Sequence, residues 1–280
     1  EIVSRDWSSD VCSSDLELAA SIRAVGVLQP FAFYDAGRIR TNVDPFVAGD
    51  NTRGQSSRRG RSAPLLSDRA VNAVVYGRRS LAAGFTTLRD LGTEGAGYAD
   101  VALKRAINEQ IIPGPRLLVA GRAIVSTGSY GPKGYDIDQQ IMLGAEPADG
   151  NDLIRVVRDQ IGKGADFIKI YADYRWGING EDQPSFTLEE LKLINEVTRS
   201  SGRAMVCHAK SKEAIRRAVL AGAETIEHGD FMDVELGKLL KEHQVTYIPT
   251  LSAVEMITQY RGWKKGIDPA PPAVVNKRKS

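Results

Sequence analysis

Histidine and cysteine are scarce in this 280-residue chain, and their scarcity limits the chemistry that it can carry. Cys12 and Cys207 are its two cysteines, too few and too far apart for a disulfide framework or a cysteine-based zinc site. Such sparse use is typical of a reducing compartment. The three histidines are His208, His228 and His243, so a site built on imidazoles must draw on these.

Long apolar runs and an excess of charge of one sign are also missing. No apolar run approaches the roughly 18 residues that a membrane helix needs, and the start EIVSRDWSSD lacks the features of a signal peptide. The 37 basic and 35 acidic residues nearly balance, which argues against a nucleic-acid groove or a polybasic membrane patch. We therefore expect a cytoplasmic protein that acts on a small molecule, and formation of a homo-oligomer stays open.

The first 65 or so residues lack the regular apolar spacing of the rest of the chain. They include arginines but no lysine, and their tract NTRGQSSRRGRS is typical of a loop or a disordered segment. The opening SRDWSSDVCSSDL resembles a translated sequencing adapter, so it is set aside from the fold. We predict three segments: an artefactual or disordered one at 1–66, a folded unit at 67–255, and a low-pattern tail at 256–280.

From residue 67 onward, helix-period and strand-like segments alternate, which indicates repeated βα units and a parallel sheet in an α/β fold. Six strands are expected, in FTTLRDL, RLLVAG, ADFIKIYAD, RAMVCHA, TIEHG and TYIPTLSA. One helix is expected before the first strand and one between each pair; that in TLEELKLINEVTRSSG begins with a capping box of Thr187 and Glu190. No glycine-rich nucleotide motif follows the first strand, which favours a (β/α)8 TIM barrel over an open sheet.

Polar residues end several of the expected strands, where the active site of such a barrel lies. They are Asp90, Lys169, His208 and His228. Two neutral imidazoles on consecutive strands, together with a third polar residue, suit zinc. A lysine buried in a barrel must be paired, modified or neutralised, because burying its charge is costly. An ion pair of Lys169 with Asp90 or Asp173 is the simpler alternative to a metal site.

Strand alternation predicts where these side chains point. Lys169 shares a face with Tyr171, and His228 shares a face with Ile226. We therefore expect Lys169, His208 and His228 to face the mouth of the barrel, which is its open end at the carboxyl ends of the strands. A structural role stays open, since a single histidine at a strand end is more often a hydrogen-bonded core residue than a ligand.

Other polar residues near the strands are weaker candidates. His243 falls in a helix and is expected at the surface, whereas Asp230 would orient a ligand histidine or cap the next helix. Tyr171 and Tyr174 are candidates for contact with a substrate, although tyrosines near strands are more often packing residues.

The segments GFTTLRDLG, GPRLLVAGRAIVSTG, GADFIKIYAD, CHA and GAETIEHGD resemble the imidazolonepropionase-like and Xaa-dipeptidase (prolidase-like) branch of the amidohydrolase superfamily. The resemblance runs from about residue 67 to about residue 255. It implies that Lys169 is carboxylated and bridges two zinc ions, and that His208 and His228 bind the second. The implied activity is hydrolysis of C–N bonds, in dipeptides or N-acyl amino acids, through a zinc-activated hydroxide.

Two parts of the family pattern have no counterpart in the chain: the H-x-H pair of the first strand and the aspartate of the last. The resemblance therefore implies a partial barrel of about six βα units, lacking the first and last catalytic strands. Such a copy would be incomplete and impaired, with at most one weakly bound zinc. Two other functions stay open: a noncatalytic barrel fragment that acts as an interaction module through its exposed edges, and a hydrolase of the lactonase or phosphotriesterase type.

Limited proteolysis of the full chain tests the expected boundary near residue 67. Because residues 1–65 lack an amphipathic period, we expect them to contribute little to the core and to be removed first. Mass spectrometry of the digest should find a stable fragment that begins near Ser67. If that fragment proves insoluble while the full chain unfolds cooperatively, the N-terminal segment belongs to the fold.

Overall fold

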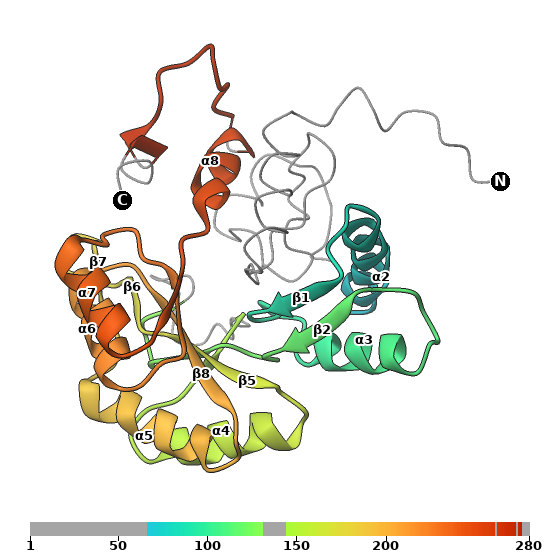
Figure 1. Ribbon diagram of the computed structural model, residues 1–280, viewed down its shortest axis with the longest axis horizontal. Coiled ribbons are helices and arrows are strands. Elements are labelled where there is room, and N and C mark those ends of the chain that lie inside the picture. Colours follow the sequence, from blue (N-terminus) through green and yellow to red (C-terminus); the bar gives the residue numbers. More distant parts are fainter. Residues whose placement is uncertain (1–65, 131–143, 261, 273, 276–280) are drawn as a thin grey trace, which may run out of the picture.

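The computed structural model describes residues 66–130, 144–260, 262–272 and 274–275, so the predicted N-terminal segment lies almost wholly outside the described residues. Within this part, parallel strands alternate with helices in an α/β fold (Figure 1). No helix in the described part is long and apolar enough to cross a membrane.

The largest sheet has six strands in the order β10-β9-β8-β5-β3-β4, and all neighbours run parallel. These strands are β3 (Ile124–Val125), β4 (Glu146–Pro147), β5 (Phe167–Tyr171), β8 (Ala204–Ala209), β9 (Thr225–His228) and β10 (Thr246–Ile248). A second parallel pair is formed by β1 (Thr87–Asp90) and β2 (Arg116–Val119).

One continuous segment, residues 116–125, connects the two sheets. Its first part, β2, pairs with β1, and its second part, β3, pairs with β5. The backbone N–H of Asp166 also donates to the carbonyl of Val119, which ties the end of β2 to the start of β5. The strands thus follow one another as in a (β/α)8 barrel. The barrel is not closed within the described residues, and the absence of the first and last strands stays a prediction.

All six predicted strands are present, and the predicted helices also form. The helices are α2 (Leu66–Ala82), α3 (Ala99–Asn108), α4 (Asp152–Gly162), α5 (Leu188–Arg199), α6 (Lys212–Leu220) and α7 (Val234–Glu242). Helix α5 begins with the predicted capping box, in which Thr187 and Glu190 each accept a hydrogen bond from the other's backbone N–H. The start of α6 is capped by the Ser211 side chain.

The structure differs from the predicted elements at three places. The two-residue strands β3 and β4 were not predicted. An antiparallel hairpin of β6 (Asp173–Arg175) and β7 (Asp182–Pro184) follows β5. The predicted strand TYIPTLSA ends at Ile248, and its last residues begin α8 (Leu251–Tyr260), which runs past the predicted boundary at residue 255. Pro249 cannot donate to a sheet, and Thr250 has a φ of 47°, so the strand cannot continue.

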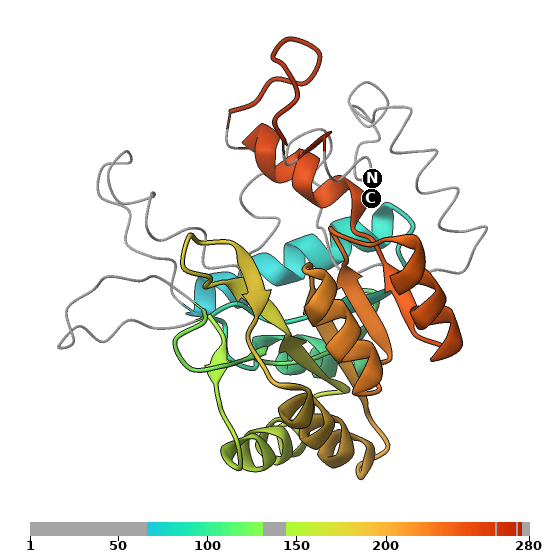
Figure 2. The ribbon, with the colours of Figure 1, turned by 90° about the vertical axis from the view of Figure 1, so that its left-hand side faces the viewer.

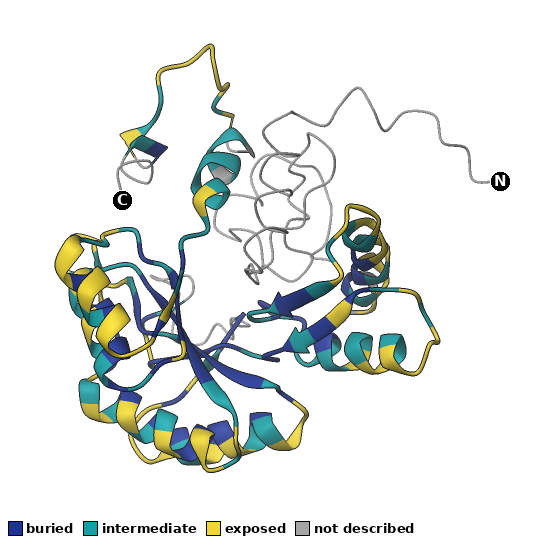
Figure 3. Ribbon diagram, in the orientation of Figure 1, coloured by how far each residue is buried: buried dark blue, intermediate teal, exposed yellow. Residues whose placement is uncertain are grey.

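The main core lies between the six-stranded sheet and helices α4 to α7. The strands are mostly buried and the outer faces of these helices are exposed (Figure 3). Helix α8 stands at the opposite end of the molecule from α4 and α5 (Figure 1, Figure 2). Alternation along the strands sends these apolar residues toward the helices: Ile168, Ile170, Met205, Cys207 and Ile226.

The other face of the sheet carries a buried ion pair. Arg89 on β1 lies 3.2 Å from Glu227 on β9, and both side chains are almost fully buried. The Thr225 hydroxyl donates to the Glu227 carboxylate at 2.7 Å and accepts from Arg89 at 3.3 Å. The Arg89 guanidinium lies over the ring of Phe167. Since β1 and β9 are not neighbours in a sheet, these contacts show that the strands curve around a common interior.

Breaking this ion pair should destabilise the fold strongly. We expect Glu227→Ala to lower the free energy of unfolding by about 3–5 kcal/mol, because it leaves the Arg89 charge buried without its partner. Urea unfolding followed by circular dichroism measures the change. Glu213→Ala is the matched control: Glu213 pairs with two arginines on the surface of α6, so its loss should cost less than about 1 kcal/mol. Equal losses in the two variants would contradict the assigned role.

Candidate active site

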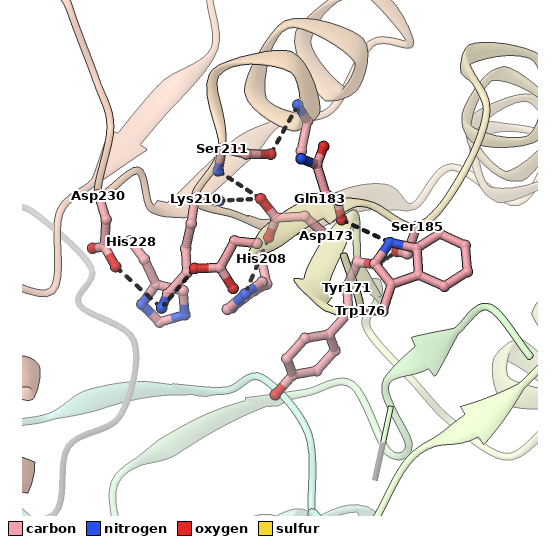
Figure 4. Close-up of polar contacts among 12 residues, drawn as sticks. Tyr171, Asp173, Trp176, Gln183, Ser185, His208, Lys210, Ser211, His228 and Asp230 are labelled. Carbon is pink, nitrogen blue, oxygen red and sulfur yellow. Dashed lines mark hydrogen bonds and ion pairs between the residues drawn. The ribbon is translucent and has the colours of Figure 1, made fainter. Parts of the chain in front are cut away.

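The carboxyl ends of β5, β8 and β9 bring Tyr171, His208 and His228 together (Figure 4), and Lys169 lies next to Tyr171. The ring of His208 lies 4.6 Å from the ring of Tyr171 and 4.6 Å from that of His228, between centroids. The Lys169 ammonium lies 5.5 Å from the Tyr171 ring centroid. Three candidate metal ligands and one candidate substrate contact therefore form a single cluster at the mouth of the open barrel.

Strand alternation accounts for the direction of Lys169 and His208. Neighbouring Ile168 and Ile170 pack in the helix-side core, so Lys169 points to the interior. His208 is the register partner of Tyr171 on one side and of Glu227 on the other, and it shares their face.

His228 reaches the mouth by a different route from the predicted one. In a regular strand His228 would point to the same side as Ile226, which packs against the helices. Ala209, which lies opposite His228 on β8, also packs in that core. Strand alternation alone would therefore turn His228 away from the mouth. The φ of His228 is 75°, in the left-handed region, and this turn at the end of β9 redirects the side chain toward His208. The predicted location was right, but the reason given for it was wrong.

Lys169 is held toward its neutral form. Burial lowers the pKa of its ammonium, and the nearby Arg89 charge lowers it further, while Glu227 acts in the opposite direction. Within the described ranges its ammonium makes no ion pair. The alternative partners are engaged elsewhere: Asp90 accepts from the Gly92 backbone, and Asp173 accepts from the backbone at the start of α6.

Burial favours the neutral form of both histidines at the mouth. Burial lowers the pKa of His208 well below its ordinary value, and the Lys169 charge lowers it further. The pKa of His228 is likewise lowered well below its ordinary value, first by burial and then by His208. Nε2 of His208 lies 3.4 Å from a carboxylate oxygen of Asp173, and Nδ1 of His228 lies 2.8 Å from the Thr250 hydroxyl. Neutral imidazole is the form that binds metals.

A buried carboxylate that sequence reasoning missed lies beside this cluster. Glu94, in the loop after β1, accepts hydrogen bonds from the hydroxyls of Tyr171, at 2.7 Å, and Tyr130. Burial raises the pKa of this carboxyl. The rings of Tyr130, Tyr171 and Tyr174 pack on one another, so Tyr171 is fixed on several sides. Glu94 stands in a glycine-rich loop without periodicity, and no local signal marks it.

The remaining candidates take less central positions. The Asp230 carboxylate pairs with Lys210 at 3.3 Å on the rim of the mouth (Figure 4). His243 is exposed at the end of α7, as expected.

The donor set at the mouth can be compared with the needs of a metal ion. No group of three or more histidine, cysteine, aspartate or glutamate side chains in the described part is arranged to hold a metal. The mouth offers two neutral imidazoles and a buried amine, which becomes an oxygen donor only when carboxylated. With Lys169 carboxylated, such a set would supply three donors, the number that a catalytic zinc takes from the protein. They do not make the complete binuclear set that the resemblance implies.

Parallel strands in barrel order, with polar side chains gathered at their carboxyl ends, define the class of (β/α) barrel proteins. The profile of the amidohydrolase family matches residues 70–264, well over half of the chain. The chain belongs to this family.

Several relatives share the family. The ochratoxinase of Aspergillus niger is 32% identical over 199 residues, which cover 64% of this chain and 40% of the relative. The crystal structure of a Xaa-Pro dipeptidase with bound methionine is 29% identical with a TM-score of 0.65, covering 79% of this chain and 55% of that one. The crystal structure of A. niger ochratoxinase, 24% identical with a TM-score of 0.63, supports the fold alone. The chain thus spans about half the length, or less, of these relatives.

Acid should destabilise the protein through the two histidines at the mouth, His208 and His228. In the unfolded chain their pKa is about 6.5, whereas burial lowers the folded pKa of both well below that value. Below pH 6.5 the unfolded state therefore binds protons that the folded state does not. The stability is present above pH 6.5 and is lost as the pH falls, by up to about 1.4 kcal/mol per pH unit for each histidine.

Urea unfolding between pH 7.5 and 5, with a chelator present, measures this contribution. We expect His208→Gln to lose less stability on acidification than the wild type, and His243→Gln, at the exposed end of α7, to follow the wild type. Burial raises the pKa of Asp90 to about 8, which favours the folded state in acid. That opposing trend is common to all three proteins and cancels in the comparison. Parallel curves for the wild type and His208→Gln would contradict the prediction.

Proposed function

We propose that the chain carries part of an amidohydrolase active site, in which Lys169, His208 and His228 hold one zinc ion for the hydrolysis of a C–N bond. The observation that supports this most is the contact between the imidazoles of buried His208 and half-buried His228, 4.6 Å apart, beside the buried Lys169 on a neighbouring strand. A core that needed only packing would not collect three such polar groups from three strands at one end of the sheet.

Carboxylation would give Lys169 a role that suits its surroundings. Its pKa is lowered, so the amine is available as a nucleophile. Attack of the neutral amine on carbon dioxide forms a nitrogen–carbon bond and releases one proton, which converts the buried amine into a carbamate anion with two oxygen donors. The Arg89 charge would stabilise that anion, whereas the Glu227 charge, which acts more strongly on Lys169, would oppose it.

The other residues of the mouth would bind and orient the substrate. Tyr171, fixed by Glu94 and by the ring of His208, forms one wall of the site and is our candidate substrate contact. When bound, zinc supplies activation of water and polarisation of the scissile carbonyl. We propose dipeptides or N-acyl amino acids as substrates, and the Xaa-Pro dipeptidase relative supports this class.

We propose that the site in this 280-residue chain is weak and slow. The chain contains three histidines, of which His243 is exposed on α7 and away from the mouth. Two imidazoles and a lysine that must first be carboxylated are therefore its donors for metal. We also propose that no aspartate of the described part passes a proton to the leaving amine, which would forgo a general acid-base contribution of about 100- to 10,000-fold.

Zinc binding tests the proposed ligands directly. We expect the full chain to hold at most about one zinc, weakly, and to bind it more tightly when bicarbonate is supplied for carboxylation. Elemental analysis after dialysis and competition with a zinc-binding dye, with and without bicarbonate, measure both effects. His208→Ala and Lys169→Gln should abolish binding, whereas His243→Gln should bind as the wild type does.

Activity is measured on the same proteins with a panel of dipeptides and N-acyl amino acids. We expect little or no turnover, and loss of any residual turnover in His208→Ala. Two tightly held metals per chain, or fast hydrolysis abolished by that substitution, would show that further ligands complete the site. Absence of zinc binding in either buffer would favour a noncatalytic protein.

A further inference from the structure

We infer that Asp173 is a positioning residue that holds the ring proton of His208 on Nε2, so that Nδ1 is the nitrogen available to a metal. The consequence for zinc rests on the proposed function. The position of the proton does not, because it is a property of the metal-free chain.

Asp173 is fixed by the backbone at the start of α6. It is fully buried at the beginning of β6, and its Oδ2 accepts hydrogen bonds from the backbone N–H groups of Lys210, at 2.8 Å, and Ser211, at 2.6 Å (Figure 4). Ser211 is also the residue that caps α6. Two donors on one oxygen fix the plane of the carboxylate and leave Oδ1 to face the mouth.

Oδ1 of Asp173 faces His208. It lies 3.4 Å from Nε2 of that ring, and it is buried without a hydrogen-bond partner of good geometry in the described part of the chain. A buried acceptor without a donor is costly, and contacts of this kind are often long in a ligand-free site and shorten in the complex.

The chemistry of the two groups then decides the tautomer. A carboxylate oxygen can only accept, and a neutral imidazole has one N–H to donate, so the proton belongs on Nε2. Nδ1 keeps its lone pair, and no hydrogen bond to Nδ1 of His208 is found among the described residues. The rings of Tyr171 and His228 pack against His208 and restrict its rotation. A carboxylate on the second nitrogen of a ligand histidine is a common arrangement in metal sites.

Asp173→Asn separates this role from a structural one. The two backbone N–H groups still require an acceptor, so the amide oxygen takes the place of Oδ2 and the amide NH2 turns toward Nε2 of His208. A donor now faces the ring where an acceptor stood. The proton must move to Nδ1, although the anchor on α6 is kept.

Nuclear magnetic resonance of the full chain with 15N-labelled histidine, metal-free, reads the tautomer directly. The chain has three histidines, and His243→Gln helps to assign them. We expect His208 to be protonated at Nε2 in the wild type and at Nδ1 in Asp173→Asn, with zinc affinity about 10- to 100-fold lower in the variant. Asp182→Asn is the control: it removes the same charge from a partner of Lys210, 3.7 Å away, and should leave the tautomer unchanged.

Two results would overturn the inference: a wild-type His208 protonated at Nδ1, or a tautomer that does not change in Asp173→Asn. If that variant fails to fold, the wild-type spectrum decides alone. A third result would separate the two proposals. If the tautomers are as predicted but the wild type binds no zinc, the role of Asp173 is supported and the proposed function is not.

Discussion

The buried ion pair between Arg89 and Glu227 holds the curvature on which the site depends. It joins β1 to β9, which have other strands between them, so it forms only when the strands wrap around an interior. The same curvature brings the loop after β1 over the end of β5, where Glu94 meets Tyr171. Arg89 lowers the pKa of Lys169 and Glu227 raises it. The same ion pair therefore influences both the shape of the interior and the charge state of its lysine.

Elements with a repeated apolar period could be predicted from the sequence, and those without one could not. The strand FIKIY and the helix that begins at the Thr187 cap carry their own signals. Strands β3 and β4 have two residues each, too short for any period. The hairpin β6–β7 is polar, and its one local signal is the Asn179–Gly180 turn. Helix α8 was missed because Pro249 follows an apolar strand that reads as if it continued.

The candidate site shows the same division between local and tertiary information. Alternation is a local property, and it placed Lys169 and His208 correctly. His228 depends on a left-handed turn, which alternation does not encode. Glu94 depends on hydroxyls that lie 36 and 77 residues away in the chain, at Tyr130 and Tyr171, and such contacts exist only in the folded protein.

The anchoring of Asp173 couples two parts of the molecule that would otherwise vary separately. The residue opens the β6–β7 hairpin at the rim of the mouth, and the same carboxylate faces the ring of His208. Insertions or substitutions in the hairpin that move its first residue therefore also move the imidazole. In this chain, a substitution in the hairpin that displaces Asp173 would change the surroundings of the His208 ring even when His208 itself stays the same.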